Sequence, residues 1–251
     1  MATDVRTEIT DRVAVLTLSN PERRNALNIE LSQKLADAVR CAAADEGVGA
    51  IVITGEGPAF CAGGDLSELA TADPATLQTV YAGFLAVAEC PLPTVAAVNG
   101  AAVGAGLNLA LACDLRLAGP HARFDARFLP LGLHPGGGYT WMVQRALGPQ
   151  RAAALTLFGD VADAAEAARI GLVHRVADDV VAAAVELAAN AAAAPPDLVR
   201  TTKATLQLTS GITAQADAVE IEVRAQAASV QSPEFRERLA ALQARISRSD
   251  R

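Results

Sequence analysis

The sequence predicts an α/β protein with a mostly parallel sheet, followed by a region made only of helices. Four short segments are apolar or β-branched enough to be strands, namely residues 13–18, 49–54, 94–98 and 115–118. Helical segments separate them, and this alternation is the order expected of parallel strands. From about Val180 onward, alanine-rich helical sequence contains no convincing strand.

The length and charge of the chain limit what it can be. With 251 residues, of which 51% are hydrophobic, it can bury a full core as one large domain or as one domain with an appendage. We place an α/β core in residues 1–190 and a helical C-terminal region in residues 191–251. The net charge of −7 and the lack of a lysine/arginine cluster argue against nucleic acid as a partner.

Cysteine usage and the N-terminal residues predict a cytoplasmic protein. The four cysteines are widely spaced and form no C-x-x-C pair, so we expect them to be reduced core residues. They are Cys41, Cys61, Cys90 and Cys113. The first eight residues contain no apolar stretch of the kind that signal peptides carry.

Caps and breakers predict the helices between the first three strands. Asn28 is a suitable N-cap for a helix that reaches about Ala44. Its apolar stripe consists of Leu31, Leu35, Ala38 and Val39. Asp65 and Glu68 have the spacing of a capping box for a short helix. A longer helix is expected from Asp73-Pro74 to about Cys90, where prolines follow.

Residues 92–114 form the most informative segment, which predicts a buried strand, a glycine-broken turn over Asn99–Gly106, and a helix ending near Asp114. A helix that starts directly after such a turn offers unpaired N–H groups and the positive end of its dipole. The small residues at positions 104–106 allow a ligand to approach those groups closely. The segment therefore predicts a site for standing or developing negative charge.

Two other interpretations of this segment are weaker. An apolar run of about twenty residues has the length of a membrane span. Pro93, Asn99, Asn108 and three glycines break it into pieces, so we expect no membrane partner. A dinucleotide-binding turn would carry glycines in the order G-x-G-x-x-G, which differs from the order found here, and this turn lies in the middle of the chain.

After the fourth strand, the sequence predicts a second glycine turn and three helices. The turn is expected at residues 136–138. The helices are expected at about residues 141–147, 150–158 and 162–169. The helical tail beyond residue 180 cannot easily bury its apolar face alone, so we expect it to pack on a neighbouring domain or subunit.

A series of motifs runs along the chain over about residues 10–205. They are Pro21-Glu-Arg-Arg-Asn-Ala-Leu27, Ala59-Phe-Cys-Ala-Gly-Gly-Asp-Leu66, Pro93-Thr-Val-Ala-Ala-Val-Asn-Gly100, Gly104-Ala-Gly106, Leu111-Ala-Cys-Asp114, Leu131-Gly-Leu-His-Pro-Gly-Gly-Gly138 and Ala164-Ala-Glu-Ala-Ala-Arg-Ile-Gly-Leu-Val173. In these motifs and their order, the chain resembles the enoyl-CoA hydratase/isomerase family, also called the crotonase superfamily. The motifs are specific together, whereas any one of them alone would be weak.

The resemblance implies a spiral of β-β-α turns, followed by a C-terminal helical region that assembles a homotrimer or a dimer of trimers. It also implies an acyl-CoA thioester as the ligand, with coenzyme A as part of the substrate and no separate cofactor. In the family, two backbone N–H groups stabilise an enolate-like oxyanion. At the matching positions here they belong to Gly64 and Ala105. A thioester oxygen that gains charge needs two donors about 3 Å away, which agrees with this assignment.

The resemblance further implies which residues bind the coenzyme A part of the substrate. The matching positions are Arg24, Ala26, Ala62, Gly64, Asp65, Leu66, Ser67 and Ala105. Arg24 is a candidate phosphate contact, and a solvated surface arginine explains it equally well. Capping explains Asp65 better than catalysis does, and we interpret Asp114 as a structural terminator of its helix.

The chain departs from the family at the two glutamates that its hydratases use to activate water and deliver a proton. The matching residues here are Asn108, one helical turn beyond Ala105, and Phe128. Asparagine can orient water but cannot take a proton near neutral pH, and phenylalanine can do neither. We therefore do not expect the usual hydratase mechanism.

Other side chains are candidates for the acid–base chemistry. His134 lies in the turn after the Phe128 segment, and histidine suits proton transfer near neutral pH. Its proline and glycine neighbours also fit a purely structural turn residue, and Asp125 is the next candidate. Tyr139 and Trp141 could line an acyl or aromatic pocket, although core packing is the more usual role. No His, Cys and Asp cluster has the spacing of metal ligands.

We interpret the chain as a crotonase-type acyl-CoA enzyme of fatty acid metabolism, a lyase or an isomerase, that stabilises a thioester enolate in a backbone oxyanion hole. Isomerases, thioester hydrolases, decarboxylases and C–C lyases of the family share that oxyanion hole, so they remain alternatives. A second hypothesis is a non-catalytic acyl-CoA binding protein, because both usual glutamates are absent.

Overall fold

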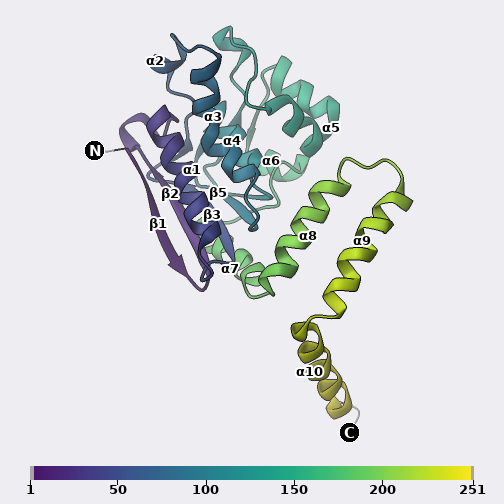
Figure 1. Cartoon of the computed structure of the whole chain (residues 1–251). Coiled ribbons are helices and arrows are strands. Elements are labelled where there is room, and N and C mark those ends of the chain that lie inside the picture. The colour runs from purple at the N-terminus through teal and green to yellow at the C-terminus, as the bar shows by residue number, and fades with distance from the viewer. Residues whose placement is uncertain (1–2, 250–251) are drawn as a thin grey trace. The chain divides into compact units, whose positions relative to one another are not determined.

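The strands of the chain form two sheets (Figure 1). A computed structural model describes residues 3–249 and divides into two units, Met1–Ala193 and Ala194–Arg251. The larger sheet has the order β1 (Asp4–Thr10), β2 (Val13–Ser19), β3 (Ala50–Gly55), β5 (Thr94–Val98), β7 (Leu115–Ala118) and β10 (Arg175–Val176). The smaller sheet has the order β4 (Ala59–Cys61), β6 (Ala101–Val103), β8 (Arg123–Asp125) and β9 (Val161–Asp163).

Most neighbouring strands are parallel, which confirms the α/β prediction. From β2 to β10 every pairing in the larger sheet is parallel, and β1 alone joins its neighbour β2 antiparallel. In the smaller sheet β6 pairs in parallel with both β4 and β8, and β9 is antiparallel to β8. The four strands expected from apolar sequence all form, each within one residue of its expected bounds.

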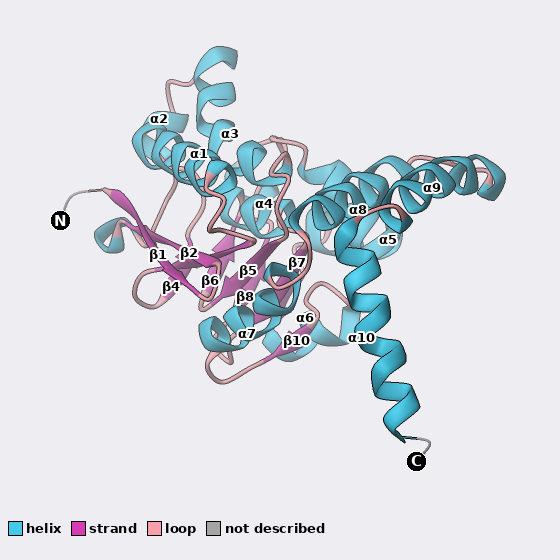
Figure 2. Ribbon diagram, turned by 60° about the horizontal axis from the view of Figure 1, so that its bottom comes forward, coloured by secondary structure: helices cyan, strands magenta, loops and turns pink. Residues whose placement is uncertain are grey.

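The larger sheet is covered on both faces because its side chains alternate between two apolar clusters. On β3, Ile51 and Ile53 pack with helices α1 (Ile29–Ala44), α3 (Pro74–Ala88) and α4 (Ala105–Ala112). Ala50 and Val52 point the other way and pack with α7 (Val180–Ala192). Figure 2 shows these two layers of helices on opposite sides of the strands.

The structure corrects several expected details. The turn expected over residues 99–106 contains strand β6, which is too short to give a periodic signal. The helices expected at residues 141–147 and 150–158 form one element, α5 (Tyr139–Leu157), broken where Gly148 takes φ 76°. The start of the next expected helix belongs to β9, so α6 begins at Ala164 and ends at Ile170.

Two side chains also differ from expectation. Cys41 is exposed on α1, because the buried stripe of that helix runs through residues 31, 35, 39 and 42, whereas the other three cysteines are buried. Asp114 does not cap α4, whose C-cap is Cys113. Its carboxylate instead accepts hydrogen bonds from Thr94 N (2.8 Å) and Thr94 Oγ1 (3.0 Å), at the start of β5.

The second unit consists of helices α8 (Pro196–Thr209), α9 (Gln215–Val230) and α10 (Pro233–Ser249). Within residues 194–249 the structure contains no strand, as the sequence predicted. Consecutive helices contact each other, and many of their large apolar side chains are exposed. Among the helices of residues 3–249, none has both the length and the apolar composition needed to cross a membrane.

Helix α4 packs directly on the backbone of β4. A Cβ added to Gly106 would lie 2.1 Å from the carbonyl oxygen of Cys61, a separation that no side chain can adopt. At the start of the same segment, a Cβ on Gly100 would lie 2.0 Å from the oxygen of Pro58. These two glycines therefore let residues 100–106 approach both ends of β4 at backbone distance.

We predict that Gly106→Ala destabilises the protein. Forcing a methyl group against a backbone carbonyl in a packed interior typically costs about 1–3 kcal/mol, so the melting temperature should fall by several degrees. Gly119→Ala is the matched control, because its Cβ would make ordinary contact with Val180 at 3.5 Å. Thermal unfolding measures both, and equal melting temperatures for the two variants would contradict the packing argument.

Candidate active site

Two strand–turn–helix segments meet at one cavity of about 250 Å³. The first runs from β4 into the short helix α2 (Leu66–Leu69), and the second runs from β6 into α4. Most of the lining is apolar, with polar side chains at a few points. The lining includes Ala62, Gly64, Leu66, Tyr81, Ala105, Asn108, Arg127, Phe128 and His134.

The N–H group of Gly64 points away from its neighbouring segment. Gly64 forms a parallel bridge with Leu27, in which Leu27 N donates to Gly63 O (2.7 Å) and Asp65 N donates to Leu27 O (2.9 Å). In a parallel bridge the two flanking residues make the bonds, so the N–H of the central residue faces the opposite side. The N–H of Gly64 therefore faces away from Leu27, and Gly64 itself lines the cavity.

The N–H group of Ala105 is the first of helix α4, and the first four N–H groups of a helix have no partner inside it. The preceding Gly104 takes φ 49°, a conformation that suits glycine and turns the chain sharply into the helix. Gly104 N donates to Asp125 O (2.9 Å), which fixes this turn against β8. The dipole of α4 adds partial positive charge at the same point.

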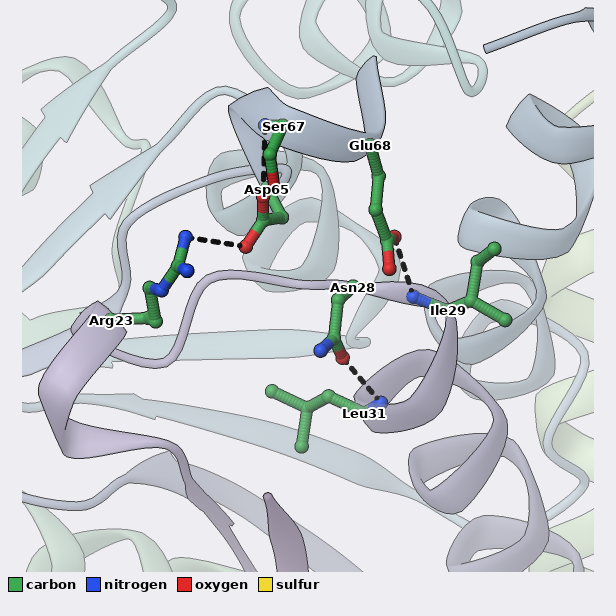
Figure 3. Close-up of polar contacts among 7 residues, drawn as sticks. All are labelled: Arg23, Asn28, Ile29, Leu31, Asp65, Ser67 and Glu68. Atoms are coloured by element: carbon green, nitrogen blue, oxygen red, sulfur yellow. Dashed lines mark hydrogen bonds and ion pairs between the residues drawn. The ribbon is translucent and has the colours of Figure 1, made fainter. Parts of the chain in front are cut away.

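Two contacts tie the first turn to residues 23–29, as Figure 3 shows. Asp65 accepts from Ser67 N (2.9 Å) and pairs with Arg23 (3.1 Å). Hydrogen bonding to Ser67, assisted by the Arg23 charge, holds the pKa of Asp65 below its usual value, so the carboxylate stays ionised. Asp65 caps α2, as predicted.

The predicted capping box is wrong in its second half. In such a box Glu68 would accept from the N–H of Asp65, but that group donates to Leu27 O. Glu68 instead accepts from Ile29 N (2.9 Å), in the first turn of α1 (Figure 3). Asn28 caps the same helix by accepting from Leu31 N (2.8 Å), as expected. Glu68 thus ties the cavity turn to the start of α1.

Asn25 joins the loop at residues 20–27 to the start of β4. It is fully buried, with φ 60°, and its amide nitrogen donates to Glu56 O and Ala59 O (both 2.9 Å). Its amide oxygen accepts from Asn20 N (2.9 Å). The sequence placed Asn25 in a motif without a role of its own, and these contacts give it a structural one.

The residues expected to hold coenzyme A fall into two groups. Ala62, Gly64, Leu66 and Ala105 line the cavity, whereas Arg24, Ala26, Asp65 and Ser67 lie outside its lining. Ala62 N donates to Arg24 O (3.0 Å), so the two loops that carry these residues lie side by side. Arg24 is exposed, which leaves its guanidinium accessible to an anionic group.

Asn108 and Phe128, the residues predicted to replace the family's glutamates, both line the cavity. Asn108 is buried, and its Nδ2 donates to Gly136 O (2.9 Å). Phe128 is buried as well, and its ring lies 5.1 Å from that of Tyr139. Neither side chain can transfer a proton near neutral pH, so the cavity wall is neutral at these two points.

His134 lines the cavity and is exposed to solvent. Its Nδ1 lies 2.7 Å from the carbonyl oxygen of Pro135. A carbonyl can only accept, so Nδ1 donates to it, and Nε2 is the acceptor of the neutral ring. Asp125 is buried outside the cavity lining, where it pairs with Arg127 (Nε at 2.9 Å).

The two aromatic candidates lie apart from the cavity lining. Tyr139 is buried in the core, as the more usual role of such residues suggested. Trp141 is 62% exposed and sits beneath the guanidinium of Arg145 at 4.3 Å, so core packing is wrong for it. Tyr81 and Arg127 also line the cavity, although no sequence motif singles them out. Within residues 3–249, no group of three or more His, Cys, Asp or Glu side chains is placed to hold a metal ion.

Comparison with known proteins identifies the family. The enoyl-CoA hydratase/isomerase family matches residues 8–245. The chain belongs to this family. A probable enoyl-CoA hydratase of Mycobacterium tuberculosis (strain ATCC 25618 / H37Rv) is 56% identical over 242 residues, which cover 93% of this chain and 94% of the relative.

More distant members of the enoyl-CoA hydratase/isomerase family match over most of their length. A 2,3-dehydroadipyl-CoA hydratase of Escherichia coli (strain K12) is 38% identical over 82% of both chains. The crystal structure of an enoyl-CoA hydratase from Polaromonas sp. JS666 superposes with a TM-score of 0.90 at 30% identity, covering 96% of this chain and 97% of that one. The crotonase-like fold expected from the motifs is confirmed.

We predict that Glu68→Ala destabilises this family member by about 1 kcal/mol, because the N–H of Ile29 loses its acceptor at the start of α1. Glu68→Gln is the matched control, since its amide oxygen can still accept from Ile29. Chemical denaturation measures both variants. A Gln variant as unstable as the Ala variant would show that the hydrogen bond to Ile29 contributes nothing.

Proposed function

We propose that the protein binds acyl-CoA thioesters and stabilises an enolate of the acyl group with the N–H groups of Gly64 and Ala105. The observation that supports this is the convergence of two separate strand–turn–helix segments on one apolar cavity. A thioester oxygen between the two groups would accept two hydrogen bonds. These bonds strengthen as the oxygen gains charge, and one such donor is usually worth a few kcal/mol of barrier.

The proton transfer that forms the enolate requires a base near the acyl α-carbon. Asn108 and Phe128 stand where hydratases of the family carry glutamates, so the two-glutamate activation of water is not open to this chain. We assign the base to Nε2 of His134. The nitrogen takes the α-proton, and the electron pair of the C–H bond moves into the enolate whose oxygen rests between Gly64 and Ala105. Asp125 is the second candidate for the base, because its carboxylate is already paired with Arg127.

This site suits reactions that form an enolate of the thioester. In isomerisation the enolate forms by loss of the α-proton, and in decarboxylation and C–C cleavage it forms by breaking a C–C bond to the α-carbon. Hydration by the two-glutamate mechanism is disfavoured, because Asn108 and Phe128 carry no carboxylate. A non-catalytic acyl-CoA binding protein is the second candidate. The observation that favours it is the neutral wall formed by Asn108 and Phe128, both buried against the cavity.

The coenzyme A part of the substrate is assigned to the loops around the first turn, through Arg24, Ala26, Ala62, Asp65, Leu66 and Ser67. We assign no other cofactor and a cytoplasmic location. We also propose that the second unit assembles copies of the chain into a trimer or a dimer of trimers. Exposed apolar residues on its helices, such as Leu198, Leu206 and Leu242, support an assembly surface there.

We predict that the protein exchanges the α-protons of butyryl-CoA for deuterium in D2O. Abstraction by His134, followed by return of a deuteron from solvent, leaves the label on the α-carbon, and mass spectrometry detects it. His134→Ala should slow the exchange by about 100-fold or more, the usual contribution of a positioned base.

His121→Ala is the control, because His121 is also exposed but lies outside the cavity lining. Calorimetric titration with butyryl-CoA accompanies the exchange assay. Tight binding without exchange would favour the non-catalytic binder over the enolate-forming enzyme. Absence of binding would contradict both candidates.

A further inference from the structure

The amide of Asn108 contains a buried acceptor without a donor. The side chain is 2% exposed, and its Nδ2 donates to Gly136 O (2.9 Å). Because a carbonyl cannot donate, this bond decides which way the amide faces. The other polar atom of the amide is the oxygen Oδ1. Among the buried side-chain nitrogen and oxygen atoms of the described residues, it is the one without a hydrogen-bond partner. Such an acceptor is costly unless a ligand supplies a donor.

The hydroxyl group of Tyr81 lies next to the same point of the chain. A Cβ added to Gly136 would lie 2.3 Å from Tyr81 Oη, so the hydroxyl occupies the space where a side chain at position 136 would begin. Tyr81 comes from α3, and both it and Asn108 line the cavity. Both polar groups therefore adjoin Gly136. Tyr81 lies against its Cα, and Asn108 donates to its carbonyl.

The two groups have opposite hydrogen-bonding needs. Burial raises the pKa of Tyr81 above its ordinary value, so the phenol keeps its proton and can donate. Asn108 Oδ1 can only accept. A single hydroxyl group satisfies both, because it donates one hydrogen bond and accepts others.

The position of this pair relative to the proposed oxyanion hole indicates which carbon of the acyl chain carries the hydroxyl. Asn108 follows Ala105 by one helical turn, and Cβ atoms three residues apart on a helix are about 5–6 Å from each other. A hydroxyl on the acyl α-carbon would stay next to the thioester oxygen. A hydroxyl on the β-carbon lies one bond farther along, which suits the offset between the two residues.

We infer that Tyr81 and Asn108 form a subsite that binds a hydroxyl group on the β-carbon of the acyl chain, with Tyr81 donating and Asn108 Oδ1 accepting. The inference rests on the proposed function, since it places the thioester oxygen between Gly64 and Ala105. Both groups are neutral, so the pair orients the hydroxyl without removing its proton. Tyr81 is therefore a positioning and specificity residue that the family motifs in this sequence do not include.

The test compares two ligands that differ by one hydroxyl, 3-hydroxybutyryl-CoA and butyryl-CoA, by isothermal titration calorimetry. The wild-type protein should bind the 3-hydroxy ligand about tenfold more tightly or better, because the butyryl ligand leaves the Asn108 acceptor unpaired. Tyr81→Phe and Asn108→Leu should each bring the affinity ratio close to one, mainly by weakening the 3-hydroxy ligand.

Tyr139→Phe is the matched control, because it removes the other tyrosine hydroxyl, which Thr156 contacts in the core outside the cavity lining. This variant should keep the wild-type ratio, and thermal melting of all three variants checks that they fold. Equal binding of the two ligands by the wild-type protein would overturn the subsite and leave the thioester function standing. An unchanged affinity ratio in Tyr81→Phe would also overturn the subsite. Failure of both ligands to bind would overturn the proposed function itself.

Discussion

The contact between Gly106 and the carbonyl of Cys61 is the constraint on which the site depends. It seats the first turn of α4 on the backbone at the end of β4, at a distance that excludes any Cβ at position 106. Because α2 follows directly from β4, the same contact brings the turn at Gly64 and the turn at Ala105 to one cavity. A single added methyl group would separate the two N–H groups that we assign to the thioester oxygen.

Two carboxylates beside the cavity are paired with arginines, and the cavity wall is neutral at Asn108, Phe128 and Tyr81. Asp65 pairs with Arg23, and Asp125 pairs with Arg127. Asn108, Phe128 and Tyr81 add no charge at neutral pH. In such a wall the oriented N–H groups and the α4 dipole are the main source of positive potential, and a low-dielectric setting strengthens their effect on a developing oxyanion.

The sequence predicted those parts of the fold whose signal is local. The strands at residues 50–55 and 94–98 are buried on both faces, so their apolar runs identify them. Strand β1 is almost wholly exposed, and β4, β6, β8 and β9 have three residues each, which is too short for a periodic pattern. The capping box failed because Ile29, far away in sequence, competes for Glu68.

The candidate site likewise contains residues that local sequence indicates and one residue that it does not. Gly64, Ala105 and Asn108 stand within or beside motifs, so the sequence singles them out as candidates. Tyr81 was missed because it sits in an apolar helix, and its significance arises from contact with Gly136, which lies fifty-five positions later in the chain. Long-range contacts of this kind leave no trace in local composition.

The central claim is that two backbone N–H groups hold the thioester oxygen, and isotope-edited infrared spectroscopy tests it most directly. Butyryl-CoA carrying ¹³C at the thioester carbonyl is bound to the protein, and its carbonyl stretch is isolated by difference from the unlabelled ligand. Two strong donors polarise the bond, so the band should shift to a lower frequency than in water. A band at or above the frequency in water would contradict the assignment of Gly64 and Ala105.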